Sequence, residues 1–101
     1  MAHVKKSEYI RISRTIVRKL FDNNCFGKGS VYINVLKSGI PSEDLDKVEI
    51  VLDVLIKQNI CCKKKKEHGW KYYLNMDRYD KIREIIKETG NKSVIPVLLM
   101  L

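Results

Sequence analysis

The chain has no long hydrophobic run. Its most apolar stretch, SVIPVLLML at the C-terminal end, is short, whereas a membrane-spanning helix needs ~20 apolar residues. The N-terminal MAHVKKSEYIRISR carries charge and no apolar segment follows it, so a secretory signal peptide is not expected. We therefore expect a cytoplasmic protein that does not associate with membranes.

Cysteine is scarce, and its pattern argues against disulfides. The chain has three cysteines, and an odd count does not make a disulfide framework. Cys25, Cys61, Cys62 and His68 carry zinc-binding atoms, but adjacent strand residues point to opposite faces of a sheet, so Cys61 and Cys62 do not easily ligate one ion. We predict no metal site, with Cys62 in the core and Cys61 partly exposed.

The short motifs that mark many enzymes are also missing. No G-x-G-x-x-G, P-loop or Ser-His-Asp pattern is present. The acids Glu43, Asp44 and Asp46 do not follow the register of an EF-hand, and acids at the start of a helix stabilise it by themselves. We expect a protein that is not an enzyme and holds no cofactor.

The chain does have a large excess of positive charge. It has 101 residues and a formal net charge of +8, which suits a single small domain with an acidic partner such as nucleic acid.

Four segments have the periodicity of helices. We predict helices at about 7–22, with Ser7 as N-cap, at about 30–37, at about 42–59 and at 77–89. The second predicted helix buries Val31, Val35 and Leu36 and ends at Ser38-Gly39, since glycine is common just past a helix end. The third predicted helix has Ser42 as N-cap and the apolar stripe Leu45, Val48, Leu52, Leu55 and Ile56.

The segment ICCKKKKEHGWKYYLN, residues 60–75, predicts a β-hairpin. Glu67-His68-Gly69 supplies the turn, because glycine adopts the positive φ that tight turns require. On the second strand Trp70, Tyr72 and Leu74 share one face. We expect Trp70 and Tyr72 to pack against the core, and Tyr73 to remain free for a ligand.

This order of elements resembles the winged helix-turn-helix superfamily over residues 9–75. The most specific part is the join of LDKVEIVLDVLIKQN to a basic hairpin that ends in WKYYLN. The resemblance implies an α+β fold that is mainly helical and has a small β-hairpin. The domain would cover residues 1–89 and would include the helix 77–89. The resemblance implies binding of double-stranded DNA, with the helix 42–59 at the major groove and the hairpin, or wing, on phosphates. The residues that map onto the wing are Lys63, Lys64, Lys65, Lys66, His68 and Lys71.

The distribution of charge changes this expectation. Residues 60–75 carry five lysines against one glutamate, and Arg11, Arg14 and Arg18 form one stripe on the first helix. The helix 42–59, in contrast, carries more acids than bases, although side chains that read bases are mostly Arg, Lys, Asn and Gln. We therefore expect the wing and the first helix to supply most of the attraction, with modest base selectivity from Ser42 and Lys47.

An alternative is a winged-helix module that binds protein within a larger complex. Ile50 and Val54 lie on the outer face of the acidic helix, where apolar side chains suit a protein partner better than a DNA groove. The apolar tail, residues 90–101, either covers the core or forms a homodimer through Tyr79–Thr89 and Val94–Leu101.

Overall fold

The computed structural model describes residues 4–87, and its longest element is helix α1 (Lys6–Asp22). Residues three and four apart along α1 form one buried face. This face comprises Tyr9, Ile12, Ser13, Ile16, Val17 and Leu20. The predicted cap at Ser7 is wrong, because the helix begins one residue earlier with Lys5 as N-cap, and the Lys5 backbone N–H donates to the Glu8 carboxylate at 3.1 Å.

The second predicted helix is shorter than expected. Val31–Tyr32 form strand β1, and helix α2 (Ile33–Lys37) begins only after them. The β-branched Val31 and the aromatic Tyr32 favour extended backbone, and both pair with a later strand. Helix α2 buries Leu36, whereas Val35 is exposed, contrary to prediction.

The third predicted helix consists of two elements. A 3-10 helix, η1 (Ser42–Lys47), leads into helix α3 (Val48–Lys57). Ser42 does not cap it, because Pro41 occupies the N-cap position and no side chain accepts a hydrogen bond there. Helix α3 buries Val48, Val51, Leu52 and Leu55. Leu45 and Ile56, which were predicted in the core, are half-buried.

The predicted hairpin is present as strands β2 (Cys61–Lys66) and β3 (Gly69–Leu74). Together with β1 they form a three-stranded antiparallel sheet in the order β1-β3-β2. Its register pairs Cys61 with Leu74 at the base and Lys66 with Gly69 at the tip. Directly opposed residues lie on the same face of a sheet. We call the face that carries Cys61, Lys63, Lys65, Trp70, Tyr72 and Leu74 the inner face, and the face that carries Cys62, Lys64, Lys66, Lys71 and Tyr73 the outer face.

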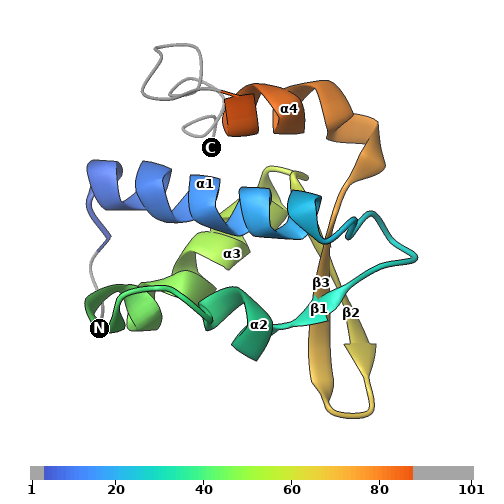
Figure 1. Ribbon diagram of the computed structural model, residues 1–101, viewed down its shortest axis with the longest axis horizontal. Coiled ribbons are helices and arrows are strands. Elements are labelled where there is room, and N and C mark those ends of the chain that lie inside the picture. The colour runs from blue at the N-terminus through green and yellow to red at the C-terminus, as the bar shows by residue number, and fades with distance from the viewer. Residues whose placement is uncertain (1–3, 88–101) are drawn as a thin grey trace.

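The register overturns two predictions of burial. Cys61, opposite Leu74 on the inner face, is only 1% exposed, whereas Cys62 on the outer face is half-buried. Tyr72 is buried as predicted, at 9% exposed, but Trp70 is 43% exposed. The two aromatic residues share a face, but Trp70 lies nearer the tip, where the hairpin extends away from the helices (Figure 1).

The chain continues through a 3-10 helix, η2 (Met76–Arg78), into helix α4 (Tyr79–Lys87). Helix α4 packs on α1 through the buried Ile82 and Ile85. It lies at the end of the molecule opposite the hairpin tip (Figure 1). The tail 90–101, including the predicted dimer contact Val94–Leu101, lies outside the described residues. No helix among residues 4–87 is long and apolar enough to cross a membrane.

The burial of the cysteines is testable by thiol reactivity. The thiolate is the reactive form, and burial raises the pKa of both Cys61 and Cys62. We expect slow labelling of native protein by Ellman's reagent at Cys62, and labelling at Cys61 and the buried Cys25 only on unfolding. Cys62→Ser should abolish the native-state reaction and Cys61→Ser should preserve it. The opposite pattern would contradict the register of the hairpin.

Candidate nucleic-acid interface

The hairpin brings together most of the predicted DNA-binding cations. Lys63, Lys65 and Lys66 are exposed, and Lys64 and Lys71 are half-buried. None of these lysines takes part in the ion pairs found among residues 4–87. Their charges are therefore available to an external anion.

On the inner face, Lys63 is packed against Trp70. The Lys63 ammonium lies 4.6 Å from the centroid of the Trp70 ring, which is within the range of a cation–π contact. Lys65 is directly opposite Trp70 in the register. The inner face near the tip thus combines an exposed indole with two ammonium groups.

Lysines also lie over aromatic rings on the outer face. The Lys71 ammonium is 5.0 Å from the Tyr32 ring centroid, and that of Lys64 is 5.4 Å from the Tyr73 ring centroid. Lys64 also donates to the Gly27 carbonyl oxygen at 2.7 Å. This bond ties the hairpin to the loop after α1. Tyr73, which we expected to be free for a ligand, is half-buried and packs against the core.

The tip of the hairpin is open and mostly cationic. Lys65, Lys66, Glu67 and Lys71 line a shallow hollow together with Tyr32. The His68 ring lies 6.4 Å from that of Tyr32, between centroids, and its Nε2 is 4.0 Å from a Glu67 carboxylate oxygen. Glu67 is the acid of the hairpin and is itself exposed at the turn, which leaves the net charge of the tip positive.

The predicted arginine stripe of α1 does not form a set of free cations. Arg11 donates to the carboxylate of Asp44 at 3.1 Å, and the Asp44 side chain is only 4% exposed. Arg18 lies 3.9 Å from Asp22, one turn further along α1, and Arg14 is half-buried. Arg11 therefore holds η1 against α1, since a buried carboxylate needs a charged partner.

Lys47, at the end of η1, also forms ion pairs within the protein. Its ammonium is hydrogen-bonded to the Glu8 carboxylate and lies 4.0 Å from Asp44. The bond lowers the pKa of Glu8 and raises the pKa of Lys47. The nearby Ser42, the other predicted source of base selectivity, is exposed at the start of η1.

The outer face of α3 is acidic, and its apolar residues are only partly exposed. Glu49 and Asp53 are exposed on α3, as is Asp46 on η1. Ile50 is half-buried, and Val54 is half-buried and packs against the core. The apolar patch predicted for a protein partner is therefore small.

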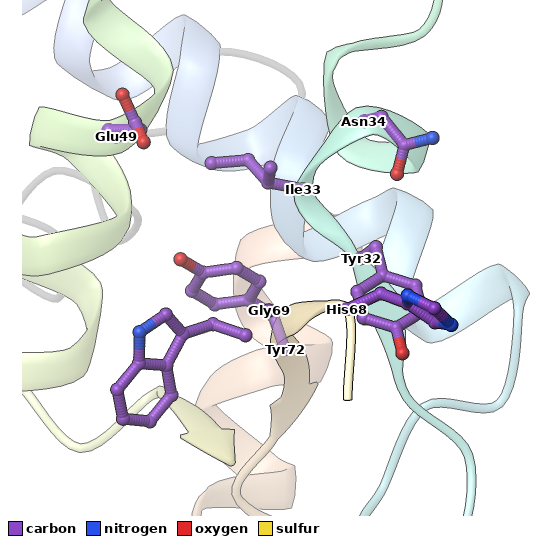
Figure 2. Close-up of a pocket in the computed structure, with 8 residues that line it drawn as sticks. Tyr32, Ile33, Asn34, Glu49, His68, Gly69 and Tyr72 are labelled. Carbon is purple, nitrogen blue, oxygen red and sulfur yellow. The ribbon is translucent and has the colours of Figure 1, made fainter. Parts of the chain in front are cut away.

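A cleft of about 460 Å³ separates α3 from the hairpin and α2. Figure 2 shows Glu49 and Asn34 on opposite sides of it, with the Tyr72 ring between α3 and the Tyr32 and His68 rings. Trp70 also lines the cleft. Burial, together with the nearby Glu49 and Asp53 carboxylates, raises the pKa of Tyr72, so its hydroxyl stays protonated at neutral pH.

Sequence reasoning missed this cleft. It placed Trp70 in the core, and it did not include Tyr32, Asn34 or Glu49 among the site residues. The Val31-Tyr32 dipeptide after a glycine-rich loop was a signal for β1. No local pattern indicated that Asn34 and Glu49 lie on opposite sides of one cleft.

Comparisons of the chain with protein-family models, with curated proteins and with solved structures find no match. Among residues 4–87, no group of three or more His, Cys, Asp or Glu side chains is placed to hold a metal ion. The chemistry of the site therefore has to be inferred from its own side chains.

The ion pair between Lys47 and Glu8 gives a prediction about the stability of the protein at acid pH. Because the pKa of Glu8 is lowered in the folded state, the unfolded state takes up the proton first as pH falls. The Glu8–Lys47 pair should therefore stabilise the protein at neutral pH, and this contribution should disappear as pH falls through the lowered pKa. We expect Lys47→Met to reduce the free energy of unfolding at neutral pH. Urea titrations at several pH values should also show that the free energy of unfolding of this variant falls less with acid than that of the native protein.

Lys57→Met is a matched control for that experiment. Lys57 is an exposed lysine at the end of α3, so its replacement removes the same charge without breaking the bond to Glu8. It should keep the acid-dependent loss of stability. If the two variants have the same pH profile, Lys47 does not stabilise the fold through Glu8.

Proposed function

We propose that this chain is a winged helix-turn-helix domain that binds double-stranded DNA, chiefly through its hairpin, as a small regulator of transcription. The described elements run in the order α1, β1, α2, η1, α3, β2, β3, η2, α4, with a three-stranded sheet ordered β1-β3-β2. A helical body with a basic antiparallel hairpin at one side supports the assignment of that hairpin as a wing.

One observation carries the proposal: the hairpin extends from the body (Figure 1) and has on both of its faces lysines that form no ion pair within residues 4–87. An ammonium group that approaches a DNA phosphate releases condensed counterions, which favours binding without regard to sequence. Lysines on two faces allow a hairpin lying along a groove to contact phosphates on both sides of it. The excess of basic residues in the whole chain adds long-range attraction.

In this proposal helix α3 contributes less to DNA binding than the helix at the major groove contributes in the family that the chain resembles. Its exposed acids Glu49 and Asp53 repel phosphates, and Lys47 is committed to Glu8. Three of the predicted DNA contacts, Arg11, Arg18 and Lys47, thus form ion pairs within the protein. Affinity should come from the hairpin, with little sequence reading by α3 through the major groove.

The alternative, a protein-binding module, has less support. It depended on Ile50 and Val54 as an exposed apolar pair, and Val54 packs against the core. The acidic face without that pair does not define a docking site. The cytoplasmic location and the dimer through Tyr79–Thr89 and Val94–Leu101 stay predictions.

The contribution of the hairpin is measurable from salt dependence. Lys65 and Lys66 are the exposed lysines nearest the tip, so their replacement by alanine should leave the fold intact. We expect the double variant to bind duplex DNA more weakly. The slope of log affinity against log salt should become shallower by about 0.9 for each phosphate that the variant no longer neutralises.

A charge-matched control separates local contact from overall charge. Lys81→Ala with Arg83→Ala removes the same charge from exposed positions on α4, at the end of the molecule far from the hairpin tip (Figure 1). This variant should keep the native salt slope. Equal slopes for the hairpin variant and the native protein would show that the tip does not hold phosphates.

A further inference from the structure

We propose that the cleft between the hairpin, α2 and α3 binds one unpaired DNA base that carries an exocyclic amino group. The proposal rests on DNA binding at the hairpin and adds a second mode of recognition, directed at single-stranded or unpaired positions. It is carried by the shape of the cleft, its aromatic walls, and the placement of its one carboxylate.

The size of the cleft suits a base and not a duplex. Its volume is about 460 Å³, which lies in the range of roughly 300–1,000 Å³ usual for small-ligand sites. It lies at the part of β3 near Gly69 and Trp70 that β1 does not cover, since β1 pairs only with Tyr72 and Lys71. A space of this volume accommodates one base and not a double helix.

The walls of the cleft are aromatic. Trp70, which is 43% exposed, lines it together with Tyr72, Tyr32 and His68. Exposed aromatic rings bind the bases of single strands by stacking, because every base has a flat π-face. The Lys63 ammonium over the indole helps to hold the ring in place without covering the whole of it.

The polar groups of the cleft discriminate between bases. An ionised Glu49 carboxylate accepts hydrogen bonds and cannot donate them, so it suits the amino group of cytosine, adenine or guanine. Thymine presents carbonyl oxygens on either side of its single ring N–H, and these oxygens meet the carboxylate with like partial charge. The protonated Tyr72 hydroxyl and the Asn34 amide supply donors for the base carbonyl or ring nitrogen.

The charges around the cleft set the orientation of the strand. Lys65 lies directly opposite Trp70 and Lys63 lies opposite the nearby Tyr72, so both lysines share the face of the hairpin that carries Trp70. Glu49 and Asp53 lie on the α3 side. The sugar-phosphate backbone is therefore attracted to the hairpin and repelled from α3, which leaves the uncharged base to reach Glu49.

The base must be unpaired to bind in this way. In a duplex, both ring faces are stacked and the amino group is bonded to the partner base. Taking a paired base out of the stack costs a few kcal/mol, and the cost is least where the base is already unpaired. The cleft consequently favours single strands, gaps and mismatches over intact duplex.

The intrinsic fluorescence of the protein tests this proposal directly, because Trp70 is the one tryptophan of the chain. We expect oligo-dC to quench Trp70 emission and to bind about fivefold or more tightly than oligo-dT of equal length, in a slightly alkaline buffer that keeps cytosine unprotonated. A blunt duplex should quench Trp70 emission less than oligo-dC does, because its stacked bases do not reach the indole. Equal quenching by the duplex and by oligo-dC would overturn the proposal.

Two variants separate stacking from recognition of the amino group. Trp70→Ala should weaken binding of labelled single strands by about fivefold or more, measured by anisotropy, and by a larger factor than it weakens binding of a duplex. Glu49→Gln should abolish the preference for oligo-dC over oligo-dT, because an amide both donates and accepts. The matched control Asp53→Asn removes a charge from the same helix outside the lining of the cleft and should keep the preference. A preference that survives Glu49→Gln would exclude Glu49 as the discriminating group.

The outcomes also distinguish this inference from the proposed duplex binding. Suppose that the Lys65 and Lys66 variant binds duplex with an unchanged salt slope while oligo-dC still quenches Trp70. The proposal that the hairpin holds duplex phosphates is then wrong, and the proposal that the cleft binds a base is supported. If duplex binding depends on those lysines while single strands leave Trp70 emission unchanged, the inference about the cleft fails alone.

Discussion

The pairing of Cys61 with Leu74 at the base of the hairpin determines which side chains the hairpin buries and which it presents to solvent. A shift of one residue in register would move every side chain of β2 to the other face. In the observed register Cys61, Tyr72 and Leu74 are buried and anchor the base of the hairpin. The same inner face continues past the core as Lys63, Lys65 and the exposed Trp70. The side chains of the inner face therefore belong to the hydrophobic core at the base of the hairpin and form a charged, aromatic surface near its tip.

The buried carboxylate of Asp44 imposes a second constraint. Removing a charge from water costs several kcal/mol unless it is paired, and the fold meets this cost with Arg11 and Lys47. These cations join η1 to α1 and are no longer free to bind an external anion. Packing of the helices therefore uses cations that would otherwise attract an external anion, and the largest continuous group of lysines without an ion pair among residues 4–87 lies on the hairpin.

Local patterns predicted the features that depend on local chemistry. Alternation and Gly69 located the hairpin, and helical spacing located α1, α3 and α4, with errors at their ends. Features that depend on distant partners were not predictable. Arg11 and Lys47 look like free cations in the sequence, because the acids that bind them lie 33 and 39 residues away. The burial of Cys61 rather than Cys62 follows from a register that the sequence of β2 alone, CCKKKK, does not specify.

The acidic surface of α3 argues against a duplex lying along it, but it is compatible with a base entering from the hairpin side. Phosphates carry the negative charge of DNA, whereas the bases are neutral and their amino groups are hydrogen-bond donors. A carboxylate such as Glu49 therefore repels the backbone of a strand and attracts part of its bases, provided that lysines hold the backbone away from it. The hairpin and α3 have these opposite charges on the two sides of one cleft. On this view the acids of α3 are part of the recognition of DNA and not an obstacle to it.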